Sequence, residues 1–160
     1  MKHDARTTFP EHCSSELLQR VAVAETDMMG VVHHGSYIAY FERGRLEYMR
    51  RRALPYKVLV ERGFHLPVVE LNVRYKKPAN FDDMLHVETR LGALTRVTVR
   101  FDYRVLRPRS EELASPTAPE LLLEAHVVLA CIDGRGKPRP VPEDAVRALL
   151  SPELGAAPHS

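Results

Sequence analysis

The sequence predicts an α+β fold in which an antiparallel sheet wraps around one long helix. Apolar residues surround most of the stretch from Tyr37 to Arg52, which is typical of a buried helix rather than a surface helix. Four later segments alternate apolar and polar residues with the period of a strand, and they are joined by links of hairpin length. Strands connected in this way pair antiparallel, so helix and sheet are expected to form separate layers.

The predicted elements follow one another in a simple order. In the first strand, at 17–25, Leu17, Val21 and Val23 alternate with polar residues. Ser36 is the predicted N-cap of the long helix, and Pro55 prevents its continuation. Two short helices and four more strands complete the chain, with helices at 56–62 and 142–150 and strands at 69–76, 85–91, 97–105 and 121–132. This gives a five-stranded sheet, in which a turn at 133–136 closes the last strand.

The chain is expected to form one domain, because its 160 residues fit a single hydrophobic core. Residues 1–15 lack periodicity and are predicted to be a flexible leader, residues 16–150 the folded domain, and residues 151–160 a flexible tail. Cys13 lies in that leader and Cys131 ends an apolar run, so no disulfide between them is expected.

The composition argues against several classes of partner. The 23 Lys and Arg residues nearly balance the 21 Asp and Glu residues, and a net charge of +2 does not indicate nucleic acid as the main partner. No apolar stretch approaches the roughly 18 residues that cross a bilayer, so no stable membrane insertion is expected. Residues 1–15 contain no apolar segment of the signal-peptide type. A cytoplasmic protein is therefore predicted.

The segment from Glu25 to Arg45 carries the chemistry. Asp27 lies in a loop after a strand, Gly30 allows that loop to turn, and the amides around His34 open the buried helix. Free amides at a helix start, together with the helix dipole, stabilise negative charge. A carboxylate beside them suits acyl transfer, in which an oxyanion forms and water is activated. Taken alone this pattern is weak, because an aspartate before a glycine is more often a turn former.

The same segment resembles the signature of the YbgC-type and 4-hydroxybenzoyl-CoA thioesterases. The residues in register are Thr26, Asp27, Gly30, Val31, Val32, His34, Tyr37, Phe41, Glu42 and Arg45. A second matching block comprises Pro67, Val68, Val69, Tyr75, Pro78, Ala79 and Asp82 to Leu85. The resemblance implies the hotdog fold, with a five-stranded antiparallel sheet around one long central helix. It also implies an acyl-CoA substrate and assembly into a homodimer with a continuous sheet, or into a homotetramer. No cofactor is expected.

The resemblance also implies roles for individual residues. Asp27 would be the nucleophile or general base that acts on the thioester carbonyl, and the backbone amide of His34 would be the oxyanion donor. Independently of the resemblance, Met28 and Met29 are expected to line the loop or the acyl pocket as plain apolar filler. The other residues implied to contact the substrate are Gly30, Val32, His33, Tyr37 and, for the CoA phosphates, Arg96.

Three positions depart from the family pattern. Glu25 stands where the family usually has Asp, a change that keeps the charge. His33 replaces the common Tyr before the helix, so a more polar or differently shaped acyl pocket is expected. Gly44 replaces the usual Ala, which weakens a helix by about 1 kcal/mol unless something packs closely against it.

Two functions from different classes remain open at the level of sequence. The first is a hydrolase that acts on short-chain, medium-chain or aromatic acyl-CoA, or on an acyl group delivered by acyl carrier protein. The second is a non-catalytic hotdog module that binds acyl thioesters as a sensor or partner protein. Asp27 favours the enzyme, because a pure binder needs no acid at that place. A metal site is not expected, because the adjacent His33 and His34 point apart and no third ligand is suitably spaced.

Overall fold

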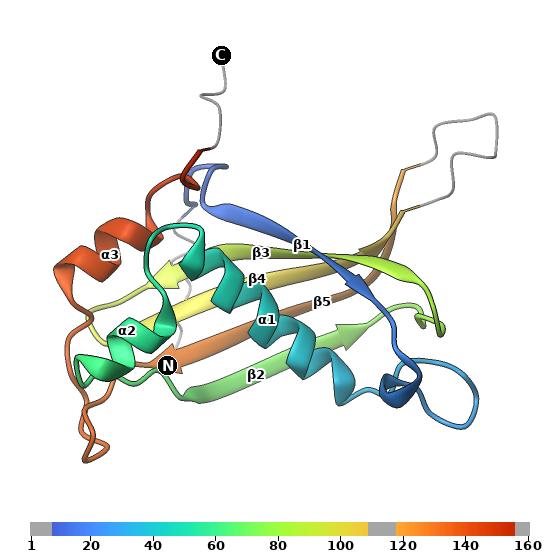
Figure 1. The fold of residues 1–160 in the computed structure, drawn as a ribbon, viewed down its shortest axis with the longest axis horizontal. Helices are drawn as coiled ribbons and strands as arrows, with labels where there is room; N and C mark the ends of the chain where they lie inside the picture. The colour runs from blue at the N-terminus through green and yellow to red at the C-terminus, as the bar shows by residue number, and fades with distance from the viewer. Residues whose placement is uncertain (1–7, 109–117, 156–160) are drawn as a thin grey trace.

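The computed structural model describes residues 8–108 and 118–155. Its centre is one five-stranded sheet with the strand order β1-β3-β4-β5-β2 (Figure 1). The strands are β1 (Ser14–Arg20), β2 (Val68–Tyr75), β3 (Met84–Leu94), β4 (Thr98–Arg107) and β5 (Glu120–Ala130). Every neighbouring pair is antiparallel, so the predicted sheet is confirmed. Because β1 and β2 are the outer strands, each has one edge without a strand partner among the described residues.

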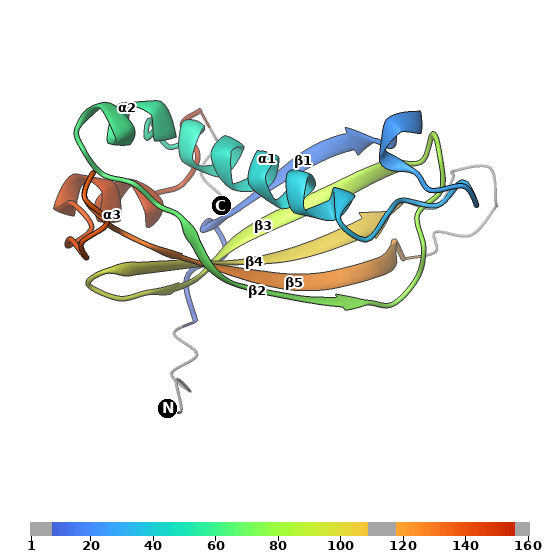
Figure 2. The ribbon, with the colours of Figure 1, turned by 90° about the horizontal axis from the view of Figure 1, so that it is seen from below.

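The long helix α1 (Ser36–Arg50) forms a second layer on one face of the sheet (Figure 2). The short helices α2 (Tyr56–Glu61) and α3 (Glu143–Leu149) lie near its C-terminal end. The buried side of α1 consists of Tyr37, Tyr40, Phe41, Gly44, Tyr48 and Met49. Ile38, on the outer side of the helix, is 47% exposed. None of the described helices is long and apolar enough to cross a membrane.

Gly44 allows α1 to approach the sheet closely. A Cβ atom added at this position would lie 2.5 Å from Oγ1 of Thr89 and 3.4 Å from Cγ1 of Val87, both on β3. Atoms do not pack at the shorter of these distances, so an alanine would force the helix and the strand apart. Gly44 therefore packs closely against β3, as expected if a glycine at this place in the helix is to be tolerated. The replacement of the usual Ala by Gly44 thus has a structural reason.

The first strand begins and ends earlier than predicted. β1 pairs with β3 in a register that ends where Arg20 lies opposite Met84, the first residue of β3. Beyond that point the chain has no partner strand, and Val23–Glu25 form the short 3-10 helix η1 instead. The predicted extension of the strand to Glu25 was wrong, because strand pairing is decided by long-range contacts rather than by local alternation.

The described ends of the chain are attached to the domain. Cys13, within the predicted leader, is buried, and its carbonyl accepts the N–H of Leu91 at 3.1 Å. The N–H of Leu154, within the predicted tail, donates to the carbonyl of Arg51 at 2.9 Å. The remainder of both predicted segments, 1–7 and 156–160, lies outside the described residues, so their flexibility stays a prediction.

The predicted N-cap of α1 was wrong by one residue. Gly35 occupies the cap position without a side-chain cap bond, and Ser36 is the first helical residue. The Ser36 hydroxyl donates instead to the carbonyl oxygen of Glu25 at 3.0 Å. The helix start is therefore tied to the segment that precedes the loop.

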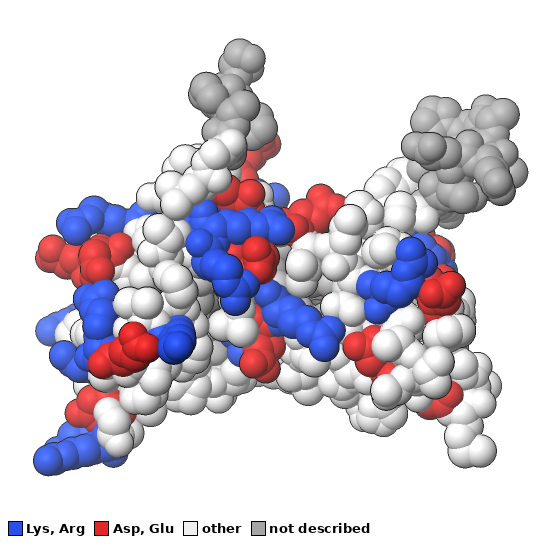
Figure 3. All heavy atoms as spheres, viewed as in Figure 1, with Lys and Arg blue, Asp and Glu red and all other residues white. Residues whose placement is uncertain are grey.

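The surface around α1 carries charges of both signs. Figure 3 shows Lys and Arg interspersed with Asp and Glu on this face. Arg43 lies 3.6 Å from a carboxylate oxygen of Glu25, and Arg51 lies 3.3 Å from one of Glu153. The described residues therefore form no uniformly basic surface on this face.

Candidate active site

The chain between η1 and α1 forms a closed loop at one end of the sheet (Figure 1). The N–H of Asp27 donates to the carbonyl of Val31 at 2.9 Å, and the N–H of Gly30 donates to the carbonyl of Asp27 at 3.1 Å. Gly30 has φ 78°, a left-handed conformation that glycine adopts without strain. The loop closes where the N–H of His33 donates to the carbonyl of Glu25 at 2.9 Å. Asp27 is therefore held beside the start of α1.

One oxygen of the Asp27 carboxylate is engaged and the other is free. Oδ1 accepts the N–H of Met29 at 2.8 Å and the N–H of Val31 at 3.4 Å. Oδ2 accepts no hydrogen bond from the residues that the structure describes, and Asp27 is exposed. Asp27 is thus a turn former, as the pattern before a glycine indicates, and the same bonds orient a carboxylate that keeps one oxygen available.

The first amides of α1 are only partly satisfied. The N–H of Gly35 donates to Nδ1 of His33 at 3.1 Å. The N–H of the exposed His34 has no acceptor within the described parts of the chain. A free amide at the start of a 15-residue helix lies at the positive end of the helix dipole. The geometry therefore offers a hydrogen-bond donor for a developing negative charge at the residue that the sequence indicated.

The edge strand β2 contributes a tyrosine that the sequence analysis did not name as a site residue. Oη of Tyr75 donates to the carbonyl oxygen of His34 at 2.8 Å, and its ring lies 5.8 Å from that of the buried Tyr37. Burial raises the pKa of both Tyr37 and Tyr75, so both hydroxyls keep their protons at neutral pH. Tyr75 belongs to the second block of family-like residues, and that was the only sequence signal for it.

His33 and His34 lie together rather than apart. Their ring centroids are 4.1 Å apart and their planes are inclined by 32°. The predicted divergence was wrong because neighbouring side chains point to opposite sides in an extended strand, whereas here the chain turns into α1. The described residues contain no group of three His, Cys, Asp or Glu placed to hold a metal ion.

The structure brings the predicted residues of the loop and helix start together and leaves Arg96 apart. Val32 is buried and pairs with Thr26 at the base of the loop. Arg96 is exposed in the turn between β3 and β4, and this turn lies at the opposite end of the sheet, near α2 and α3 (Figure 1). Among the described residues Arg96 is therefore not part of this site, and its contact with the CoA phosphates stays a prediction.

Met28 and Met29 project from the tip of the loop. Their exposed fractions are 104% and 87%. In this chain they fill neither the loop nor a pocket, contrary to the expectation.

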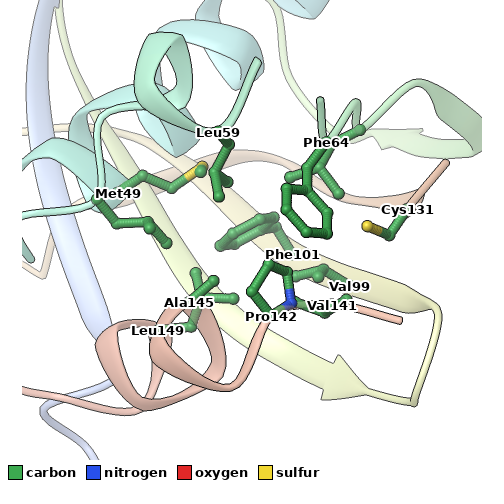
Figure 4. A pocket seen from close by; sticks show the side chains of 12 residues that line it. Met49, Leu59, Phe64, Val99, Phe101, Cys131, Val141, Pro142, Ala145 and Leu149 are labelled. Carbon is green, nitrogen blue, oxygen red and sulfur yellow. The ribbon is translucent and has the colours of Figure 1, made fainter. Parts of the chain in front are cut away.

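A small apolar cavity lies at the other end of α1. Its lining includes Met49, Leu59 and Phe101, together with Ala145 and Leu149 of α3 (Figure 4). Its volume of about 10 Å³ is at the limit of what one water molecule needs. A second, open depression of about 350 Å³ has a polar lining from β1, β3, β4 and neighbouring residues. Neither contains Asp27 or His34, so neither is an acyl pocket beside the candidate site.

Comparison with known proteins identifies the family. A family model described as the thioesterase-like superfamily matches residues 21–149, which is most of the chain. The chain belongs to this superfamily. An acyl-CoA thioesterase YbgC of Haemophilus influenzae is 34% identical over 132 residues, which cover 81% of this chain and 90% of the relative. An acyl-CoA thioester hydrolase YbgC of Escherichia coli is 32% identical over 128 residues, which cover 79% and 89%.

Solved structures agree with this family. A probable thioesterase from Bartonella henselae is 31% identical with a TM-score of 0.70, and the match covers 81% of this chain and 99% of that one. A 4-hydroxybenzoyl-CoA thioesterase in complex with 4-hydroxybenzoyl-CoA has a TM-score of 0.75 at 22% identity, with 85% and 98% covered. At this identity, the likeness to the 4-hydroxybenzoyl-CoA thioesterase is evidence for the fold alone. The predicted hotdog fold and the family resemblance are confirmed, and the chain is a thioester hydrolase.

Proposed function

We propose that the chain hydrolyses acyl-CoA thioesters at the site formed by Asp27 and the start of α1. The observation that carries this proposal is the joint placement of a carboxylate with one free oxygen and a helix-terminal amide without an acceptor. The hydrogen bond between His33 and Glu25 holds these two groups at the same end of the molecule. The names of the two YbgC relatives support acyl-CoA as the substrate.

The proposed chemistry uses the two groups together. The thioester carbonyl oxygen accepts the N–H of His34, and this bond strengthens as negative charge develops on the oxygen. One such donor lowers the barrier by about 2.7–4 kcal/mol. Asp27 then acts in one of two ways. Either its free oxygen attacks the carbonyl carbon, the thiolate of CoA leaves and water hydrolyses the anhydride, or the carboxylate takes a proton from a water molecule that attacks directly. Both routes need an ionised Asp27 and release a free acid and CoA.

A second copy of the chain is proposed to complete the site. The free edge of β2 carries exposed apolar residues, with Val68 48%, Val69 60% and Leu71 39% exposed. A free sheet edge with apolar side chains readily pairs with another strand. Pairing of β2 with β2 of a second copy gives the continuous sheet that the family resemblance implies, in a homodimer that can pair again into a homotetramer. Tyr75, which contacts the helix start, lies on this same edge strand.

The acyl group is proposed to lie between the two copies, since neither of the two hollows described above borders Asp27 or His34. Met28 and Met29 at the loop tip and His33 at the helix start would then border the acyl group. The shape of this interface sets the preference among short, medium-chain and aromatic acyl groups. It also sets whether CoA or acyl carrier protein delivers them. The cytoplasmic location stays a prediction.

The test is thiol release from a panel of short-chain, medium-chain and aromatic acyl-CoAs by the wild type and by Asp27→Asn. Loss of the carboxylate is expected to lower kcat by about 10²–10⁴-fold, the usual contribution of a general base. Circular dichroism and calorimetric titration with acyl-CoA are expected to show an unchanged fold and retained binding. A fully active variant rejects Asp27 as the catalytic residue. A wild type that binds acyl-CoA without turnover shows a binding module instead.

A further inference from the structure

Glu25 connects the loop that carries Asp27 to the helix that carries the proposed oxyanion donor. Its carbonyl oxygen accepts the N–H of His33 at 2.9 Å and the hydroxyl of Ser36 at 3.0 Å, so it holds both residues that flank the helix start. Its side-chain oxygen Oε2 accepts the N–H of Ala22 at 2.9 Å and the hydroxyl of Tyr40 at 2.6 Å. One residue thus bonds to the segment before the loop and to two turns of α1.

Tyr40 is a fixed anchor for this carboxylate. Its side chain is fully buried on the sheet-facing side of α1. Burial and the neighbouring Glu25 raise its pKa, so the hydroxyl is a permanent donor at neutral pH. Within the described parts of the chain, Glu25 is its only hydrogen-bond partner. Arg43, one helical turn further along, is half exposed and lies 3.6 Å from Oε1 of Glu25, which makes it the weaker contact.

We infer that Glu25 is a positioning residue that, through its bond to Tyr40, sets the separation between the Asp27 carboxylate and the amide of His34. This inference rests on the proposed function, in which these two groups act on one thioester. Glu25 does not touch the substrate in this scheme. Its contribution is to keep the loop and the helix start in register, because a small displacement of reacting groups costs a large factor in rate.

The bond geometry separates a positioning role from a role of the charge. Both Ala22 and Tyr40 donate to the same atom, Oε2. In Glu25→Gln the amide oxygen can take the place of Oε2 and accept both bonds, while the amide group faces the half-exposed Arg43. Glu25→Ala removes both bonds, and Tyr40→Phe removes only the anchor. Arg43→Gln removes the ion pair with Glu25 and the hydrogen bond from Arg43 to Gln19, leaves both bonds to Oε2 in place, and serves as the control.

The first experiment measures steady-state kinetics of these four variants with the best acyl-CoA of the panel, at a temperature well below every melting transition. Glu25→Ala and Tyr40→Phe are expected to lower kcat by about 10- to 100-fold with little change in KM. Glu25→Gln is expected to stay within about threefold of the wild type, with the same pH profile, since the bonds that fix the geometry remain. Arg43→Gln is expected to match the wild type. A Glu25→Gln variant as inactive as Asp27→Asn overturns the inference, because the charge of Glu25 would then be needed for the reaction.

The second experiment measures backbone hydrogen exchange and does not depend on activity. Glu25→Ala is expected to speed exchange at the amides of 27–36 relative to those in the middle of α1, whereas Glu25→Gln leaves both unchanged. Equal exchange in Glu25→Ala and the wild type contradicts the positioning role. The two proposals fail separately. Full activity of Asp27→Asn rejects the catalytic assignment, and the exchange data still decide whether Glu25 holds the loop.

Discussion

Two loops of this protein have the same internal geometry and different surroundings. In the loop from Asp27 to Val31, Oδ1 of the aspartate accepts N–H groups two and four residues later, at 2.8 and 3.4 Å. In the loop from Asp133 to Lys137, Oδ1 accepts the corresponding N–H groups at 2.8 and 3.0 Å. The backbone bonds correspond as well, and the glycines at the fourth position have φ 78° and 81°. Both sequences read Asp-x-x-Gly.

The two loops differ in the groups that lie beside the aspartate. The chain after Val31 turns into α1, where the amide of His34 has no acceptor among the described residues. The chain after Lys137 returns beside its own strand, where Pro138 bridges to Ile132. The tip of the first loop is Met28-Met29, and that of the second is Gly134-Arg135. Turn chemistry alone therefore does not distinguish Asp27 from Asp133, whereas the helix start beside Asp27 does.

The largest expected contrast is between Asp27→Asn and Asp133→Asn. Asparagine keeps an oxygen that accepts the loop bonds, so both loops should fold. Asp27→Asn is expected to lose about 10²–10⁴-fold in kcat, whereas Asp133→Asn keeps wild-type activity because no proposed reacting group lies beside it. Thiol release from one acyl-CoA, measured for both proteins in parallel, checks this. Equal losses in the two variants would break the distinction between the loops.

The two glycines provide a second contrast. Gly30→Ala and Gly136→Ala each place a side chain at positive φ, and a Cβ at either position meets no atom within 4 Å. The cost is therefore backbone strain alone, about 1–2 kcal/mol in the free energy of unfolding for each variant. Only Gly30→Ala is expected to lower kcat as well, because only its loop positions the carboxylate. Denaturant unfolding and thiol release are measured on both, and a loss of activity in Gly136→Ala contradicts the comparison.

Tyr75→Phe tests the contact between β2 and the helix start. It removes the hydroxyl that donates to the carbonyl of His34 at 2.8 Å. A bond of this kind contributes about 0.5–1.5 kcal/mol, so kcat/KM is expected to fall by about threefold to tenfold. Tyr56→Phe is the matched control, since the hydroxyl of Tyr56 also makes one hydrogen bond to the backbone, which it accepts from the N–H of Leu66. Equal effects of the two variants on kcat/KM would mean that Tyr75 has no special relation to the site.

The smallest expected effect is a pH dependence of stability that arises in the second loop. The N–H groups of Lys137 and Arg135 lower the pKa of Asp133 below its ordinary 3.8. A carboxyl group whose pKa is lower in the folded state stabilises the fold above the unfolded-state pKa. That contribution is lost as the pH falls below about 3.8 toward the folded value. Melting temperatures at pH 7 and pH 3 should therefore differ slightly less in Asp133→Asn than in the wild type. An identical difference in both proteins would show that Asp133 makes no such contribution to stability.

The order of the elements and the burial of α1 could be predicted from the sequence, and so could the candidate carboxylate. Alternation in the segments that became β2 to β5, and the apolar residues around Tyr40 and Phe41, are local properties set by the geometry of strand and helix. The family signature then singled out Asp27 and His34. The error at the end of β1 lies where a distant partner decides, because that end follows the start of β3 at Met84.

The sequence by itself therefore determined the family, the fold class and the two groups proposed to react. Only the tertiary structure decided that Tyr75 contacts the helix start, that Glu25 bonds to Tyr40, and that Arg96 lies at the other end of the sheet. The difference between the two Asp-x-x-Gly loops was also decided only by the tertiary structure, because their internal hydrogen bonds are identical in kind. Local periodicity and turn chemistry arise from neighbours along the chain. The contacts that distinguish the proposed site from the second loop arise from residues that only folding brings together.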